Sequence, residues 1–486
     1  MVILIKATLI EMIYRQSKVV VILLMFFITA NRILLSQNYK IEVFVSEQPN
    51  EEVVLGSVKG DKFTPVDTVM PEAGNITFEL SNDDAIGVYR LLLGQTVYAQ
   101  VMHEAPQKID FIFNHEDCIL KSNFNSPADS LQVIASKENK VWIRFLRLEK
   151  AYSKQLTDLV TQINYFQAKP DDNYYTDIRK KSVVKKYNEI QQKRNSLVSL
   201  TAKKCLGLFA SKMIKMYSEP FMDGNLTEKE RNLLFEKDYF KKLDFSDEIL
   251  INSPVYTKKV YTYLIAYIKK DLQHGEKIRE MNIAVDEIIE NTSSNKVVGD
   301  FVVEFLMRGF EILKLNEVLQ HIAEIYTPNS SCEDGDKSTL VRRLNSQKML
   351  PGTLAPEFSL IGVAGDSVSL SNISSKYKLI VFWASWCPHC EQLLPDLYQW
   401  YLNRDIDIEV VAVSIDENQD DWRAFVTERG YNWINCSEPE KWDGRVAVAY
   451  DIYATPTMFL LDKENLIISK PLTFNEFLDT TMSLTE

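Results

Sequence analysis

Two cysteines separated by two residues, Cys387 and Cys390, have the clearest capacity for chemistry in this sequence. They stand in the stretch "ASWCPHCEQLLP", which follows the apolar run "KLIVFW" and continues with the pattern of a helix. The N-terminus of a helix carries partial positive charge and unpaired N–H groups, which stabilise a thiolate there. The spacing puts Cys390 one turn further along, within reach of a disulfide. We therefore predict that Cys387 attacks as a thiolate and that Cys390 resolves the mixed disulfide.

The two residues between the cysteines, Pro388 and His389, fit this chemistry. Pro388 suits the first helical turn, where no backbone donor is needed. The imidazole of His389 would add a donor or a positive charge beside Cys387, and thiols in such motifs have pKa values from roughly 7 down to about 3.5. A more stabilised thiolate makes the disulfide more oxidising. The sequence favours this tuning role for His389 over that of an ordinary exposed helix residue.

A zinc site is the alternative use of such a cysteine pair. Zinc usually takes four Cys, His or carboxylate ligands, most often from two short paired motifs. The sequence has no second Cys-X-X-Cys and no His-X-X-His pair, and Cys436 stands alone. We therefore predict no metal site and no organic cofactor.

The other cysteines are too widely spread for a small disulfide scaffold. They are Cys118, Cys205, Cys332 and Cys436. We predict buried or unpaired thiols at these positions, and one long-range bridge among them stays open. The fold must therefore rest mainly on its hydrophobic cores.

Length and charge restrict the class of protein. A chain of 486 residues suggests about three domains of ~100–200 residues each, and 46% hydrophobic with 25% charged residues indicates a globular protein. The formal net charge is −12. Nucleic-acid surfaces need clustered Lys and Arg to displace counterions from phosphates, so we predict no nucleic-acid partner.

Residues 1–36 have the pattern of a secretory signal peptide. Arg15 and Lys18 precede the apolar run Val19–Ala30. That run is short for a helix that spans a hydrocarbon core of ~30 Å, although extension to Leu35 leaves an uncleaved anchor open. Export predicts a location in the periplasm or cell envelope, where disulfides persist. Membrane attachment is expected only if this segment stays uncleaved.

The next two parts differ in the period of their apolar residues. Residues 37–135 contain short alternating or apolar runs between turn residues, which predicts an antiparallel β-sandwich domain. Residues 136–328 change to helical spacing after a candidate cap at Ser136 and predict an α-helical domain. Within it, the basic residues of 179–200 share a face that we expect to be solvated. Residues 300–326 read as one continuous helix.

The last two parts are a linker and an α/β domain. Residues 329–348 are polar, with Gly, Pro and acidic side chains, and are predicted to be a linker. Residues 349–486 alternate strands with helices, which is typical of an α/β fold. The chain as a whole is therefore predicted to be multidomain.

Residues 349–486 resemble the thioredoxin-fold domains of TlpA/ResA-like, redoxin-related proteins. The likeness is carried by "MLPGTLAPEFSLIGVAGDSVSLSNI", "KLIVFWASWCPHCEQLLPDL" and "YDIYATPTMFLLDKEN". The resemblance implies that Trp386 precedes the nucleophile and that Pro395 kinks the active-site helix. It also implies a cis-proline turn at Thr455 and Pro456, beside the dithiol. In the family this turn presents backbone to an extended substrate peptide, so both residues are expected to bind substrate.

Four positions depart from related patterns. Thioredoxins place a buried Asp where this chain has Val381, and many TlpA/ResA-like proteins place a Glu where it has Leu393. The acceptor of the Cys390 proton is therefore open among Glu391, His389 and water. Peroxiredoxins carry a Pro and a Thr seven and three positions before the reactive cysteine. This chain has an Ile and an Ala there, which argues against a peroxidase.

The N-terminal part resembles, more diffusely, a β-sandwich domain of unknown function that precedes such thioredoxin domains in exported bacterial proteins. "GVYRLLL", "KIDFIFN" and "NSPADSLQVIASKENKVW" carry the likeness. It supports a three-part envelope protein and supplies no site.

Two functions follow. The first is an exported thiol–disulfide oxidoreductase that exchanges disulfides with envelope proteins. The Cys-Pro-His-Cys motif suggests an oxidising or isomerising couple, whereas the TlpA/ResA-like context implies a reductant fed by a membrane thiol electron donor; we favour the reductant or exchange role. The alternative is an envelope binding or assembly protein, in which the N-terminal two domains capture a partner and the dithiol is ancillary.

Overall fold

The computed structural model divides the chain into two compact units, with the boundary between Ala266 and Tyr267. It describes residues 38–96, 101–168, 174–268, 272–326, 339–347 and 349–484. The predicted signal or anchor segment, residues 1–36, lies outside the described residues. None of the helices in the described ranges is long and apolar enough to cross a membrane. The unit boundary falls inside the region predicted to be one helical domain.

The first unit begins with two four-stranded sheets, of strand order β4-β1-β7-β8 and β3-β2-β5-β6. The strands are β1 (Tyr39–Ser46), β2 (Val53–Lys59), β3 (Lys62–Val69), β4 (Asn75–Leu80), β5 (Gly87–Leu92), β6 (Lys108–Phe113), β7 (Cys118–Asn123) and β8 (Gln132–Ala135). Alternate residues of β1 are buried, as a half-buried strand requires. Ile41 and Val43 of one sheet share a core with Leu55 and Phe111 of the other.

The prediction of antiparallel pairing is wrong at one place. β1 and β7 run parallel, with Ile41 opposite Cys118. β7 follows β6, a strand of the other sheet, after the short connection 114–117. It pairs with β1, the first strand of the described residues, instead of forming a hairpin with its predecessor. Period-2 patterning marks a strand but does not reveal which strand lies beside it.

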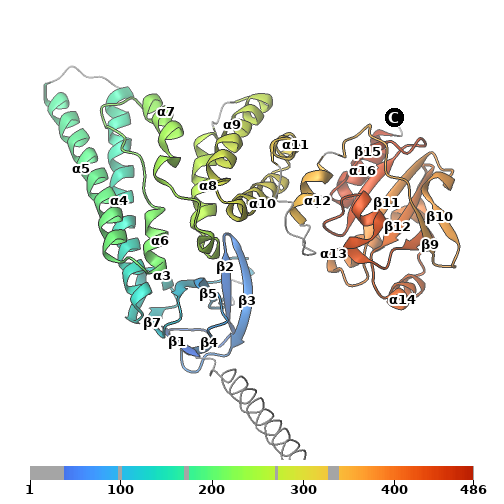
Figure 1. The fold of residues 1–486 in the computed structure, drawn as a ribbon, viewed down its shortest axis with the longest axis horizontal. Helices are drawn as coiled ribbons and strands as arrows, with labels where there is room; N and C mark the ends of the chain where they lie inside the picture. Colours follow the sequence, from blue (N-terminus) through green and yellow to red (C-terminus); the bar gives the residue numbers. More distant parts are fainter. Residues whose placement is uncertain are drawn as a thin grey trace, which may run out of the picture. The chain divides into compact units, whose positions relative to one another are not determined.

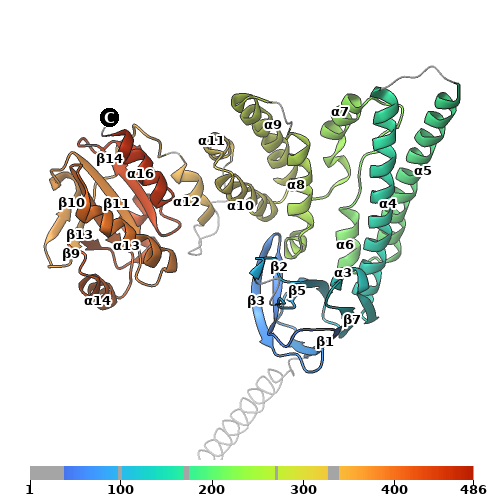
Figure 2. The same ribbon diagram turned by 180° about the vertical axis from the view of Figure 1, so that it is seen from behind.

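Helices complete the first unit. They are α3 (Pro127–Ser130), α4 (Lys137–Ala168), α5 (Tyr174–Lys204), α6 (Phe209–Lys215), α7 (Glu228–Asp238), η1 (Phe240–Lys242), η2 (Glu248–Asn252) and α8 (Val255–Ala266). The predicted cap is present, because Ser136 Oγ accepts a hydrogen bond of 2.9 Å from the Asn139 N–H. Figures 1 and 2 show α4 and α5 from opposite sides as two long helices lying next to each other.

A buried group of charges joins α4, α5 and α8. Arg194 of α5, expected on a solvated face, is only 5% exposed. Its guanidinium contacts Glu149 at 2.6 Å and also pairs with Glu219. Lys259 approaches Glu219 to 3.7 Å, and burial lowers the pKa of Lys259 to about 8. The expectation for Arg194 fails because helical period alone cannot show that two acids from other segments meet it.

Removal of Arg194 should be costly, because the buried carboxylate of Glu149 and the half-buried carboxylate of Glu219 would lose their main partner. We expect Arg194→Leu to lower the local unfolding free energy of α4 and α5 by about 3–5 kcal/mol, measured by hydrogen exchange. Lys181→Leu is the matched control, since its ion pair with Asp177 is exposed and should contribute less than about 1 kcal/mol. Equal, small effects of the two substitutions would contradict a structural role for the buried cluster.

The second unit starts with α9 (His274–Thr292), α10 (Lys296–Ile312), α11 (Asn316–Ile325) and α12 (Thr339–Ser346). The single helix predicted for 300–326 is interrupted at Lys314, whose φ of 55° is left-handed. The linker prediction for 329–348 is wrong over α12. The helix was not predicted because the surrounding residues are mostly polar and its apolar residues are too few to show a helical period. Leu344 of α12 is buried, and Arg342 donates a hydrogen bond to the Trp442 carbonyl.

A seven-stranded sheet of order β10-β9-β13-β12-β11-β14-β15 forms the centre of the C-terminal α/β domain. Its strands are β9 (Ser359–Gly362), β10 (Ser367–Ser369), β11 (Tyr377–Trp383), β12 (Ile408–Ser414), β13 (Ile434–Ser437), β14 (Thr457–Leu461) and β15 (Ile467–Ser469). β11, β12 and β13 are parallel, and the other pairings are antiparallel. The α/β class predicted for this part of the chain is confirmed.

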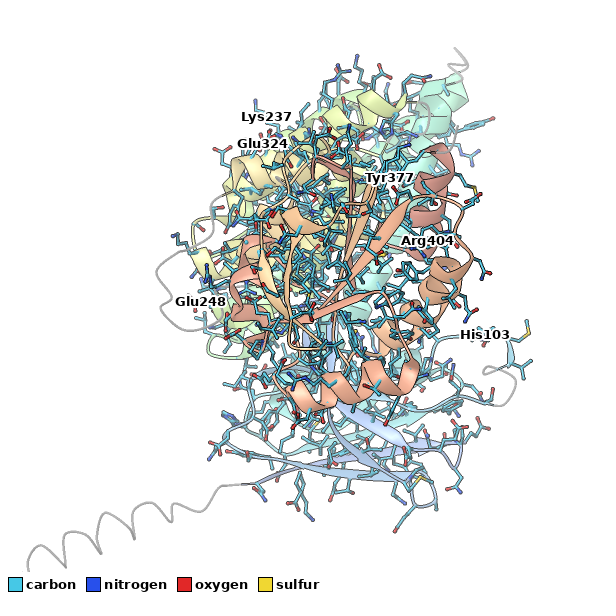
Figure 3. The ribbon with its side chains drawn as sticks, turned by 90° about the vertical axis from the view of Figure 1, so that its right-hand side faces the viewer. His103, Lys237, Glu248, Glu324, Tyr377 and Arg404 are labelled. Carbon is cyan, nitrogen blue, oxygen red and sulfur yellow. The ribbon has the colours of Figure 1, made fainter. Side chains whose placement is uncertain are left out.

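Helices flank this sheet. They are α13 (Pro388–Asn403), α14 (Gln419–Arg429), α15 (Arg445–Ala449) and α16 (Phe474–Ser483), together with η3 (Leu370–Asn372) and η4 (Lys441–Asp443). α13 packs on α16, where the rings of Trp400 and Phe477 lie 4.6 Å apart. Arg404, labelled in Figure 3, ends α13 and donates a hydrogen bond of 2.8 Å to the Ile408 carbonyl at the start of β12. α13 is thus held at its C-terminal end.

Candidate active site

Cys387 lies at the junction of the central strand β11 and helix α13. It is the N-cap residue of α13, and its sulfur accepts a hydrogen bond of 3.4 Å from the Cys390 N–H. Pro388 occupies the first turn, where the helix has no use for its missing N–H. The site forms here because six consecutive buried residues of β11 end the strand in the core and the chain then turns into the helix. Pro395 lies inside α13, as the resemblance implies.

A cis-peptide bond joins Thr455 to Pro456, directly before β14. The Cys387 thiol donates a hydrogen bond of 3.2 Å to the Thr455 carbonyl. The structure therefore brings the loop of Thr455 and Pro456 to the dithiol, at the position that the resemblance implied. Both residues are half-buried, so part of each faces the surface next to the nucleophile.

The two thiols differ strongly in acidity. Burial disfavours the charged form of Cys387, but hydrogen bonds to its sulfur from Cys390, Thr455 and the backbone N–H groups of Cys390 and His389 outweigh burial, so its pKa lies below its ordinary value. Burial, reinforced by the neighbouring Cys387, raises the pKa of Cys390 to about 12. Cys387 is 5% exposed and Cys390 is fully buried. The arrangement thus provides one reactive thiolate and one protonated reserve thiol.

The predicted tuning residues flank the thiols in sequence, and His389 is the one among them that interacts with Cys387 in the described part of the structure. Pro388 and His389 are exposed, and His389 stabilises the Cys387 thiolate through its backbone N–H. Trp386 is 50% exposed, and its ring centroid lies 6.3 Å from that of Trp442. A tuning role for the His389 imidazole or for Trp386 stays a prediction. The exposed Trp386 ring offers apolar surface directly beside the nucleophile.

The acid positions of relatives hold apolar side chains in this structure. Val381 is fully buried, Leu393 is half-buried against the core, and Glu391 is exposed. A different carboxylate, Asp416, is buried and binds Ser385, two residues before Cys387. No motif in the sequence points to Asp416. The available signal was its place directly after β12, at the same end of the sheet as the dithiol.

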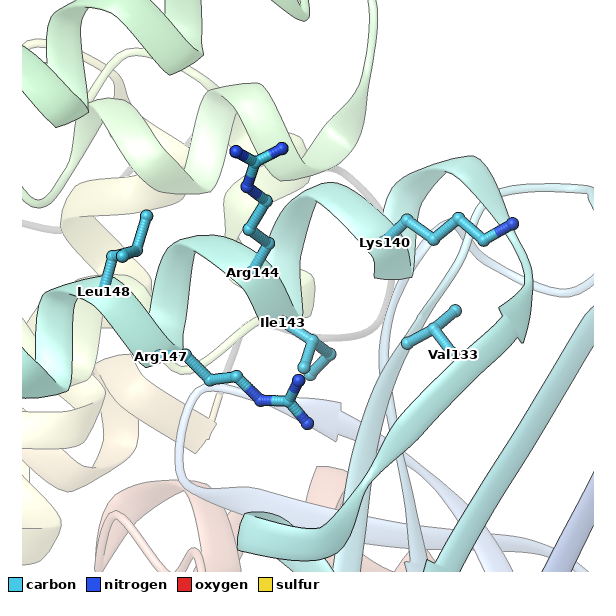
Figure 4. Close-up of a pocket in the computed structure, with 6 residues that line it drawn as sticks. All are labelled: Val133, Lys140, Ile143, Arg144, Arg147 and Leu148. Atoms are coloured by element: carbon cyan, nitrogen blue, oxygen red, sulfur yellow. The ribbon is translucent and has the colours of Figure 1, made fainter.

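Three other features of the described residues lie apart from this site. No group of His, Cys, Asp and Glu in the described ranges could hold a metal ion. Cys118, Cys205 and Cys436 are free thiols, whereas Cys332 lies outside the described residues. A hollow of about 360 Å³ in the first unit, shown in Figure 4, contains no dithiol residue. It is lined by Val133, Lys140, Ile143, Arg144, Arg147 and Leu148.

The difference in acidity predicts selective alkylation. In the reduced protein near pH 7, iodoacetamide should modify Cys387 at least about tenfold faster than Cys390, because only thiolates react. The rate at Cys387 should fall as the pH drops through its lowered pKa, and Cys390 should react only toward pH 12. Mass spectrometry of digested samples measures both rates, with buried Cys436 as an unreactive internal control. Equal rates at Cys387 and Cys390 would contradict the assigned roles.

Comparisons with known proteins agree with this geometry. Residues 351–470 match the model of the AhpC/TSA family. The thiol–disulfide oxidoreductase ResA of Bacillus thuringiensis (strain Al Hakam) is 27% identical over 129 residues, which are 26% of this chain and 72% of that protein.

Two solved structures are also similar. One is the thioredoxin domain of a thiol–disulfide oxidoreductase from Bacteroides vulgatus, which is 27% identical. The match covers 28% of this chain and 99% of that chain, with a TM-score of 0.26. The other is a domain of a possible thiol–disulfide isomerase from Cytophaga hutchinsonii, with 33% identity, 28% of this chain, 93% of that chain and a TM-score of 0.26. By its sheet, its Cys387–Cys390 pair and its sequence relatives, the C-terminal part of the chain is a redoxin-related, TlpA/ResA-like thioredoxin-fold domain of the thiol–disulfide oxidoreductase class.

Proposed function

We propose that this protein exchanges disulfides with proteins of the cell envelope through Cys387 and Cys390. The observation that carries the proposal is the geometry of the pair: the Cys387 sulfur accepts the Cys390 N–H at the helix N-terminus, and Cys390 is fully buried one turn further along. This geometry moves the pKa values of the two thiols in opposite directions. A structural disulfide needs no such difference, whereas a two-step exchange requires one thiol that attacks and one that waits. The proposed chemistry needs neither a metal nor an organic cofactor.

In the reducing direction, the Cys387 thiolate attacks one sulfur of a substrate disulfide. A new S–S bond joins Cys387 to the substrate, and the other substrate sulfur leaves as a thiolate that takes up a proton. Cys390 then loses its proton and attacks the Cys387 sulfur, which releases the second substrate thiol. The substrate gains two electrons and two protons in total, and the protein retains the Cys387–Cys390 disulfide. The same steps in reverse oxidise a dithiol substrate.

The loop of Thr455 and Pro456 is proposed to hold the substrate segment during exchange. The Thr455 carbonyl already contacts the Cys387 thiol at 3.2 Å, so a chain that lies along this loop reaches the sulfur. Trp386, which is exposed and directly precedes the nucleophile in sequence, would cover the apolar side chains of such a segment. Recognition of this kind reads backbone and shape, which suits a protein that exchanges with several partners.

Direction, location and electron supply are further parts of the proposal. We favour a reductant or exchange role, fed by a membrane thiol electron donor, because one of the sequence relatives of this domain is a ResA protein. Location in the periplasm or envelope is proposed from the pattern of residues 1–36. A peroxidase is not favoured by the family match, because Ile380 and Ala384 are apolar, fully buried and unable to activate a peroxide. The alternative, an envelope binding protein with an ancillary dithiol, makes the dithiol dispensable.

Trapping of partners tests the proposed exchange. Cys390→Ala should accumulate mixed disulfides through Cys387, because no thiol remains to release the substrate. Cys387→Ala should accumulate none, and both variants should lose insulin-reducing activity by at least about a hundredfold.

Cys436→Ala is the matched control, since it removes another buried thiol that hydrogen-bonds only weakly to a strand carbonyl. It should keep wild-type exchange. Two results together would support the binding-protein alternative. The wild-type disulfide would resist dithiothreitol and the protein would reduce no insulin, and the Cys390→Ala variant would trap no adduct.

A further inference from the structure

We propose that Asp416 is a positioning residue for the dithiol. Its buried carboxylate holds the turn between β11 and α13 in the geometry in which the backbone of this turn hydrogen-bonds to Cys387 and Cys390. The inference rests on the proposed exchange function and names a residue that the motif itself does not contain.

Both oxygens of the Asp416 carboxylate accept hydrogen bonds, from Ser385 in the turn and from Ser414 at the end of β12. Its Oδ1 accepts hydrogen bonds from the Ser385 hydroxyl at 2.8 Å and from the Ser385 N–H at 3.1 Å. Its Oδ2 accepts from the same N–H at 3.0 Å and from the Ser414 hydroxyl at 2.7 Å. Asp416 is only 2% exposed. A buried charge is tolerated in a fold only when donors of this kind satisfy it.

Strand register explains why Asp416 meets this turn. β11 and β12 are parallel neighbours, with Trp383 opposite Ser414. The Ile415 N–H donates a 2.9 Å hydrogen bond to the Trp383 carbonyl, so the pairing continues one residue past β12. Both chains therefore leave the sheet together. Asp416 directly follows Ile415, the last residue of this pairing on the β12 side. Ser385 lies two residues after the end of β11, and its N–H and hydroxyl donate to the Asp416 carboxylate.

The residue next to Ser385 contacts both cysteines. The Ala384 carbonyl accepts the Cys387 N–H at 3.2 Å. The Ala384 N–H hydrogen-bonds to the Cys390 sulfur and favours its thiolate, against the larger opposing effect of burial. The Ser385 N–H and the Ala384 carbonyl belong to one planar peptide group, so Asp416 orients that carbonyl directly. Loss of the carboxylate would therefore weaken the contact of this carbonyl with the Cys387 N–H, and would loosen the adjoining peptide group that carries the Ala384 N–H.

Positioning and simple charge predict opposite results. The negative charge of Asp416, acting alone over distance, would raise the pKa of Cys387, so its removal would lower that pKa. As a positioning group, Asp416 supports the N-cap geometry through which the Cys390 and His389 N–H groups reach the Cys387 sulfur. Its removal would then raise the pKa of Cys387. The sign of the shift thus separates the two effects.

The experiment compares Asp416→Asn with the wild-type full chain. Asparagine keeps the size but replaces one acceptor oxygen with a donor, which faces the Ser385 or Ser414 donors. We expect the midpoint of the pH profile of Cys387 alkylation by iodoacetamide to rise, with the rate below the midpoint falling about tenfold. Because the reduced form loses thiolate stabilisation, the equilibrium with glutathione should also shift toward the oxidised Cys387–Cys390 disulfide.

Glu438→Gln is the matched control. Glu438 is equally buried in the same domain, but its carboxylate holds α15 through the Val446 and Ala447 N–H groups at 2.9 and 3.0 Å. This control should lose thermal stability and keep the wild-type alkylation profile. A change in the profile of the control as large as that of Asp416→Asn would mean that general destabilisation is the cause, and would overturn the proposal.

Ser385→Ala keeps the test decisive if Asp416→Asn does not fold. It removes only the 2.8 Å hydroxyl contact and should shift the Cys387 midpoint upward by a smaller amount. An unchanged or lowered midpoint in the folded variant overturns the proposal. Failure of the proposed function looks different, because the wild-type protein itself would then show no glutathione exchange and no insulin reduction.

Discussion

The chemistry of this protein depends on one sulfur atom held at the start of a buried-strand-to-helix junction. The Cys387 sulfur receives N–H groups from the first turn of α13, and these outweigh the cost of its burial. The same turn takes Cys390 into the core, where burial keeps its thiol protonated. One local structure therefore creates both members of the pair.

The sheet delivers the remaining parts of the site from both neighbours of the central strand. β12 lies on one side of β11 and ends next to Asp416, which binds the turn before the helix. β14 lies on the other side and begins after the cis-proline loop, whose Thr455 carbonyl contacts the Cys387 thiol. Residues distant in sequence thus bracket the dithiol, because β11 and β12 end, and the antiparallel β14 begins, at the same edge of the sheet. The rigid sheet sets the spacing, and the loops supply the polar groups.

Sequence reasoning succeeded where the information is local. The strand, the dithiol and the helix that holds Cys387 are contiguous, so period and spacing were sufficient to predict them. Asp416 was missed because its contact with Ser385 depends on the register of two strands, which no local pattern encodes. Arg194 was assigned to a solvated face for the same reason, since its two acidic partners come from other segments. The helix Thr339–Ser346 was taken as linker because its short polar sequence resembles the stretch before it.

The redox equilibrium of the full chain with glutathione tests the central claim most directly. Oxidised and reduced Cys387–Cys390 are quantified by acid quenching, alkylation and mass spectrometry across a series of glutathione ratios. An active exchange centre of the reducing or exchange type predicts a reversible two-electron transition with a potential of roughly −270 to −180 mV. A potential near −120 mV would contradict the reducing direction. A disulfide that stays oxidised below about −300 mV, as structural disulfides do, would contradict the exchange function itself.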